Sequence, residues 1–277
     1  MNLILTEFQK LKRYSVILVG LIGAACSPVI SIVMQNVMSD DAKSVLNYTF
    51  PDLVNSTIWN NMTIFFPMIL ALIGGYMISR EYTDDTLKSL MTVPVGFPRL
   101  MTGKLTALGI IALLLGFFAA LMTLLVGLVS CRENLTLPVV FSGSVQMTAM
   151  ALFTCIGELP LIALCGRKQG AFRGGAVAAF LLGYMAIFFK NPVLRNLYPL
   201  SAGLSIVGFG GEGFVSDTAG GYASTQNAFI GSCVLLAMIL LTAVITHLPG
   251  KDAVTAASPK KGGRGRRNRR ERMIPRC

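Results

Sequence analysis

The chain has 277 residues, of which 53% are hydrophobic and 13% are charged, and its formal net charge is +11. A soluble domain carries roughly 25% charged residues, so this composition and the mean hydropathy of +0.65 exclude an ordinary soluble protein. A single His excludes a multi-histidine metal site and the six Cys form no CxxC pair, so we expect no cofactor-binding or metal site in the chain.

The first 13 residues carry apolar side chains at helical spacing, while polar residues fall largely elsewhere on the helical wheel. The apolar positions are Met1, Ile4, Leu5, Phe8 and Leu11. This pattern predicts an amphipathic helix over residues 1–13 that lies in the membrane interface. The alternative is a plain extension of the first membrane span.

Six later stretches are long enough to cross a bilayer, which takes about 20 mostly apolar residues. We predict spans at Tyr14–Val33, Met62–Ile78, Leu105–Val129, Val139–Leu164, Gly174–Phe189 and Phe229–His247. The first has the basic flank of a signal peptide, but its apolar stretch continues past any cleavage point, so we interpret it as an uncleaved helix. The fold class is an all-α integral membrane protein with six transmembrane helices.

The distribution of Lys and Arg between the loops predicts the orientation. With the N-terminus in the cytoplasm, the inner segments hold 20 of these residues. The outer loops then hold four, which are Lys43, Arg132, Lys190 and Arg195. Both termini are therefore predicted to be cytoplasmic, which requires an even number of spans.

The predicted outer loops are unequal in length. The first runs from about Met34 to Asn61, and we expect Tyr48, Phe50 and Trp59 to anchor the second span at the interface. The third, about 190–228, is rich in Gly and has apolar portions. Such a segment is predicted to dip into the outer leaflet, where protein or water must satisfy its backbone.

Residues 251–277 are polar and hold ten Lys and Arg. Such a run cannot bury an apolar core, so it predicts a disordered cytoplasmic tail drawn to anionic lipid, and we expect no nucleic-acid partner. The predicted organisation is an interfacial helix at 1–13, a six-helix transmembrane domain at 14–250 and the tail at 251–277.

The inner loop after the second span, Ser79–Pro94, is the most informative stretch. Its acidic residues come before Lys88, an order that suits the helix dipole. An apolar stripe at helical spacing is formed by Thr86, Leu87, Leu90 and Met91. The loop therefore predicts a short amphipathic helix that ends at Pro94. From the residues alone it is either an ordinary charged loop or an element that docks on a partner.

A longer pattern runs through this loop and into the next span. It consists of Arg80-Glu81, Thr86-Leu87, Pro94, Arg99 and Gly103-Lys104, with Tyr198-Pro199-Leu200-Ser201 in the third outer loop. With the six spans, it resembles the ABC-2-type permeases, the membrane halves of ATP-driven exporters, over residues 1–250. The small permeases of lantibiotic and bacitracin resistance systems look most similar. Asp85 departs from the pattern, because the family usually has Gly directly before the Thr that corresponds to Thr86.

The resemblance implies a permease subunit in a bacterial cell membrane that exports an amphipathic substrate, such as an antimicrobial peptide or a drug. It implies a homo- or heterodimer of permeases with two copies of a separate ABC ATPase, which carries the ATP and Mg. The ATPase-coupling residues would be Arg80, Glu81, Thr83, Asp84, Asp85, Thr86, Leu87, Lys88 and Leu90. Glu81 would anchor the coupling helix to the base of the second span through a nearby cation.

The chain has no phosphate loop, whose pattern is G-x-x-x-x-G-K-[ST]. The nearest candidate runs from Gly96 to Gly103-Lys104, but it has six intervening residues and Leu105 in place of Ser or Thr. No other catalytic set can be assembled, so we expect a transport subunit and not an enzyme.

Glu158 is the only acidic residue well inside a predicted span, and Pro160 follows it closely. A carboxylate within a membrane is a candidate functional group, which here could line a pathway for a cationic substrate or titrate. The alternative is that it pairs with a neighbouring cation such as Arg167 or Lys168. Three other functions stay open: a proton-coupled secondary carrier that uses Glu158, a sensor or assembly subunit that transports nothing, and a membrane-embedded enzyme, which the scarcity of polar catalytic groups disfavours.

Overall fold

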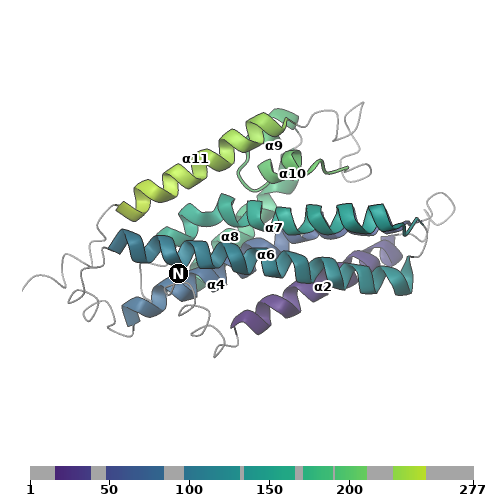
Figure 1. Ribbon diagram of the computed structural model, residues 1–277, viewed down its shortest axis with the longest axis horizontal. Coiled ribbons are helices and arrows are strands. Elements are labelled where there is room, and N and C mark those ends of the chain that lie inside the picture. Colours follow the sequence, from purple (N-terminus) through teal and green to yellow (C-terminus); the bar gives the residue numbers. More distant parts are fainter. Residues whose placement is uncertain are drawn as a thin grey trace, which may run out of the picture. The chain divides into compact units, whose positions relative to one another are not determined.

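The computed structural model describes residues 16–38, 48–83, 97–131, 134–165, 171–189, 191–210 and 227–247. Within these ranges every regular element is a helix and no strand occurs (Figure 1). The interfacial helix predicted at 1–13 and the tail predicted at 251–277 lie outside the described residues. The orientation of the termini and the domain boundaries stay predictions.

Six helical segments among the described residues are long and apolar enough to span a membrane. They are α2 (Val16–Met38), the continuous run of α3 (Phe50–Asn60), η1 (Asn61–Phe65) and α4 (Phe66–Thr83), then α6 (Phe97–Ser130), α7 (Leu137–Cys165), α8 (Ala171–Met185) with η2 (Ala186–Phe188), and α11 (Ala228–His247). Two short helices, α9 (Pro192–Leu197) and α10 (Ala202–Val207), precede α11. The prediction of six apolar spans is confirmed, and the chain is a multi-pass membrane protein.

The second span begins at Phe50 and not at Met62, so the predicted first outer loop is wrong over its last part. The Asp52 carboxylate caps the new start, because it accepts hydrogen bonds from the backbone N–H and the hydroxyl of Thr49 at 2.9 and 2.6 Å. Ser56 and Thr57 donate to carbonyls one turn earlier, at 2.7 and 2.8 Å. Polar side chains that lowered the local hydropathy are thus satisfied within the helix.

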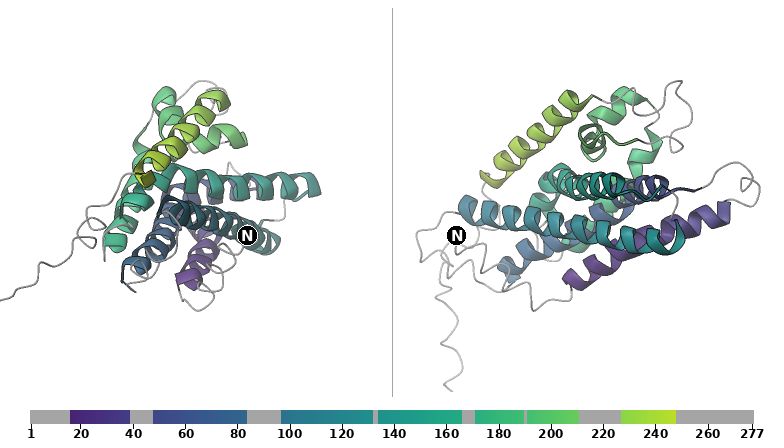
Figure 2. Two further views of the ribbon diagram at one scale, coloured as in Figure 1. Left: turned by 60° about the vertical axis from the view of Figure 1, so that its left-hand side comes forward. Right: turned by 45° about the vertical axis from the view of Figure 1, so that its right-hand side comes forward.

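The run α3–η1–α4 is the central element of the bundle. In its most apolar stretch 72% of the residues are buried, whereas the corresponding shares are 28% in α2 and 22% in α11. Helices approach closely at glycines: a Cβ on Gly116 of α6 would lie 2.7 Å from the Ala151 Cβ of α7, and one on Gly74 of α4 would meet Leu108 and Ile162. In the views of Figures 1 and 2, α2 and α11 lie on opposite sides of the α6–α7 pair.

The outward faces of α2, α6 and α11 expose large apolar side chains, as lipid-facing helices do. Examples are Leu18, Ile22, Leu114, Phe117, Leu236 and Leu240. This surface supports the membrane assignment independently of the helix lengths.

The apolar part of the third predicted outer loop forms a hairpin of two short helices, the α9–α10 hairpin (residues 191–210), which packs on α7. A Cβ on Gly157 would lie 2.8 Å from the Pro199 carbonyl oxygen, and one on Gly203 would lie 2.7 Å from Phe153. At 1.5 Å per residue, Gly157 lies about 30 Å from the start of α7 and about 12 Å from its end. The turn at Pro199 therefore reaches far along the span.

Candidate functional site

The last turns of α4 are tied to α6 by a buried lysine. Lys104 is 3% exposed, and its Nζ donates to the Met77 carbonyl oxygen at 3.0 Å. That carbonyl lies one helical turn before the backbone position of Glu81, since helical partners are four residues apart. A buried ammonium group needs such a partner. Lys104 thus fixes the end of α4 at the position where the predicted coupling segment begins.

Most of that predicted segment lies outside the described residues. Arg80 is half-buried in the last turn of α4, and the backbone of Glu81 and Thr83 continues the helix. The undescribed residues are Asp84, Asp85, Thr86, Leu87, Lys88 and Leu90. The coupling helix and the anchoring role of Glu81 therefore stay predictions.

Glu158 of α7 is enclosed by protein. It is 2% exposed, and neither carboxylate oxygen has a hydrogen-bond partner among the described residues. Glu158 also acts on the α9–α10 hairpin. The pKa of Tyr198 is raised to about 12, mainly because the phenol is buried and secondly because of the negative charge of Glu158. The alternative pairing with Arg167 or Lys168 lies outside the described residues.

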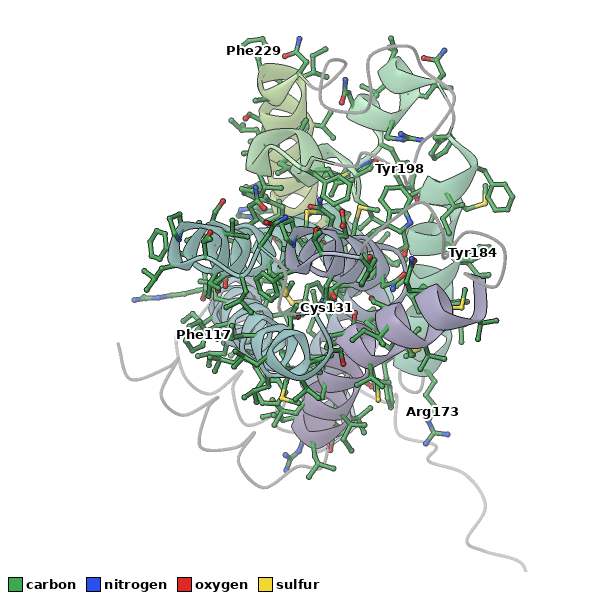
Figure 3. The ribbon with its side chains drawn as sticks, turned by 90° about the vertical axis from the view of Figure 1, so that its right-hand side faces the viewer. Phe117, Cys131, Arg173, Tyr184, Tyr198 and Phe229 are labelled. Atoms are coloured by element: carbon green, nitrogen blue, oxygen red, sulfur yellow. The ribbon has the colours of Figure 1, made fainter. Side chains whose placement is uncertain are left out.

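The α9–α10 hairpin is held to α8 and to the residue that follows η2. The Tyr198 hydroxyl donates to the Leu182 carbonyl at 2.5 Å. Arg195, 4% exposed, donates through Nε and Nη2 to the Phe189 carbonyl at 3.1 and 2.8 Å. Figure 3 shows Tyr198 among the helices, whereas Phe117 points outward from the bundle. Sequence reasoning counted Arg195 only as an outer-loop cation, because its burial depends on contacts that are not local.

The aromatic residues expected at the interface make contacts within the protein, and only Phe50 is fully buried. Phe50 is 2% exposed and lies against Gly127, and the hydroxyls of Tyr48 and Ser56 are hydrogen-bonded at 2.8 Å. The Trp59 ring lies 6.0 Å from the Arg195 guanidinium carbon, and it stacks on Phe209 with centroids 6.2 Å apart. Phe50 is therefore a core residue, and the anchoring interpretation is wrong for it.

A second buried polar side chain without a partner lies in the π-helical segment η1. Asn61 is fully buried, and neither atom of its amide is hydrogen-bonded among the described residues. Sequence reasoning missed Asn61 because it was placed in a loop. Its only signal was an amide next to an apolar run.

The described residues offer neither a metal site nor a polar groove. They contain no group of three or more His, Cys, Asp or Glu that could hold a metal. A groove of about 410 Å³ lies between α2 and α6. It is lined by Val29, Ile32, Val33, Leu125, Val126, Val129 and Ser130. Its mainly apolar lining suits a hydrocarbon chain and provides no charged group.

Comparison with known proteins agrees with the resemblance seen in the sequence. A family described as ABC-2 family transporter protein matches residues 3–186, more than half of the chain. The bacitracin transport permease protein BCRB of Bacillus licheniformis is 28% identical over 148 residues, which are 52% of this chain. The chain spans 60% of the length of that relative. With six apolar spans and a family match over most of them, the chain belongs to the ABC-2 family of transporter proteins.

Proposed function

We propose that this permease subunit works in an ATP-driven exporter of a bacterial cell membrane and takes its energy from a separate ABC ATPase. The proposed substrate is an amphipathic molecule, and an antimicrobial peptide is the first choice. The family supports the role of membrane subunit. The name of the relative, a bacitracin transport permease, supports a peptide substrate.

The observation that supports the proposed energy coupling is the hydrogen bond from Lys104 to the Met77 carbonyl. It joins α4 to α6 directly before the loop whose residues resemble the coupling signature. A force on that loop would therefore move two packed spans together. A conformational change of this kind is a shift between two packings of the bundle, biased by the ligand state of the ATPase.

The proposed assembly contains two permease subunits and two ATPase copies. ATP binding would draw the ATPases together and displace the coupling helices, and Glu81 would hold each coupling helix to the end of α4. The bound ATP and Mg would belong to the ATPase. Whether the two permeases are identical would be read from the subunit masses of the intact complex.

The test combines co-purification with resistance. A tagged chain is expected to recover an ABC ATPase, and Glu81→Ala is expected to lower both the recovery and the protection against bacitracin toward those of cells without the permease. Arg173→Gln is the matched control, because Arg173 is an exposed charge on α8 outside the coupling segment. If the tagged chain recovers no ATPase and Glu81→Ala keeps full protection, the proposed coupling is wrong.

A proton-coupled carrier is the second candidate, because Glu158 is a buried carboxyl group without a partner among the described residues. Such a carrier would stop when the proton gradient is collapsed and would continue when ATP is depleted, whereas the exporter would show the reverse. A sensor or assembly subunit would bind the peptide without moving it across a vesicle membrane.

A further inference from the structure

Glu158 is not explained by packing. Its two oxygens lack partners at 2% exposure, and a buried polar group without a hydrogen bond costs free energy, more so within a membrane. The other buried charged side chains among the described residues have partners: Lys104 donates to the Met77 carbonyl, and Arg195 donates to the Phe189 carbonyl. Glu158 is thus the exception.

Among the described residues, the surroundings of Glu158 offer a hydrogen-bonding group, and no cation is bonded to its carboxylate. Cys155, one turn earlier on α7, is 1% exposed and carries a free thiol. Tyr198 is close enough for Glu158 to affect its phenol, but its hydroxyl already donates to Leu182. In the part of the chain that the structure describes, the carboxylate thus has neither a cation nor a hydrogen-bond donor as a partner.

The structure also has a weak point at this place. Pro160 lies inside α7 and has no backbone N–H, so the hydrogen bond to the Ile156 carbonyl is missing. On the neighbouring face, the turn at Pro199 rests directly on the backbone of Gly157. A bend at Pro160 or a small shift of the α9–α10 hairpin would therefore change the packing next to Glu158 without unfolding a helix.

We propose that Glu158 binds the primary ammonium group of an amphiphile, which enters when the turn at Pro199 moves off Gly157. This inference rests on the proposed export of amphipathic substrates and names the polar group that the site selects. An ammonium group brings the missing charge and three N–H donors, which form short, strong hydrogen bonds to carboxylate oxygens.

The test measures how tightly two probes bind to the full chain in nanodiscs of phosphatidylcholine, because this lipid has no primary amine. Two fluorescent probes share one dodecyl chain, and one ends in an ammonium group while the other ends in a hydroxyl group. Empty nanodiscs give the background partitioning. We expect the wild-type chain to bind the ammonium probe about tenfold more tightly than the hydroxyl probe, which corresponds to about 1.4 kcal/mol.

Glu158→Gln keeps the size and removes the charge, so it is expected to bind both probes equally, and Glu158→Asp is expected to restore part of the preference. Elution as a single species and an unchanged melting temperature establish that each variant is folded. In phosphatidylethanolamine nanodiscs, a loss of the preference in the wild type identifies the lipid headgroup as an occupant of the site. A retained preference shows that the headgroup does not compete, and it identifies a free amphiphile as the occupant.

Equal affinity of the wild-type chain for the two probes, or a Glu158→Gln variant that keeps the ammonium preference, would overturn the proposal. The measurement needs no ATPase, so it is separate from the test of energy coupling. A chain that prefers ammonium but recovers no ATPase would keep the site and lose the exporter. A chain that recovers the ATPase without the preference would do the opposite.

Discussion

The contact between Gly157 and the α9–α10 hairpin predicts a large effect for one added methyl group. A Cβ at Gly157 would lie 2.8 Å from the Pro199 carbonyl oxygen and 3.2 Å from its carbonyl carbon. Both atoms are backbone, so neither can turn away as a flexible side chain would. Overpacking of this kind costs about 1–3 kcal/mol, and we expect Gly157→Ala to push the hairpin off α7.

Gly174→Ala is the matched control, because a Cβ there meets nothing within 4 Å and Gly174 is also helical. Each substitution gains about 0.5–1 kcal/mol of helix propensity, so the difference between the variants isolates the packing cost. With about 2–4 °C for each kcal/mol in a chain of 150–250 residues, thermal unfolding in detergent should separate their melting temperatures by roughly 2–12 °C. Melting temperatures that agree within about 1 °C would refute the reasoning.

Three other substitutions test separate contacts. Lys104→Met keeps the stem but loses a charge-assisted hydrogen bond to the Met77 carbonyl, worth about 1.5–3 kcal/mol; we expect a lower melting temperature, and an unchanged one would contradict this. Asp52→Ala removes the acceptor for Thr49 and should cost about 1 kcal/mol in the same assay, with Asp52→Asn closer to wild type. Burial raises the pKa of Tyr48 from 10.0 to about 12. The folded state therefore holds the phenol proton more tightly, and this stability is present below about pH 10 and lost as the pH rises through about 12. Alkaline unfolding should be shallower in Tyr48→Phe, and an equally steep loss would count against the assignment.

The number of spans could be predicted from the sequence because the hydropathy of each span is summed over many apolar residues. The start of the second span could not, since polar residues interrupt the hydropathy there. Asn60 is satisfied across the bundle, where its Nδ2 donates to the Ser31 hydroxyl at 3.0 Å. A partner 29 residues away in the chain does not enter a local average.

The candidate site, too, could be predicted only in part from the sequence. A carboxylate in an apolar run identified Glu158 from the sequence, but its lack of a partner among the described residues needed coordinates. Lys104 was part of the family pattern at the edge of a predicted span, and its burial became visible only through its contact with Met77. Arg195 and Tyr198 required the fold of the α9–α10 hairpin, which joins distant parts of the chain.

The π-helical segment η1 has a consequence for how this family member can diversify. A π turn holds an extra residue, and each residue turns an α-helix by about 100°, so α3 and α4 do not share one helical register. Phe50 of α3 lies against Gly127, while Gly75 of α4 lies against Phe172. The two halves of this span can therefore change separately: a substitution that turns or shifts α3 is expected to leave the packing of α4 on its own neighbours unchanged.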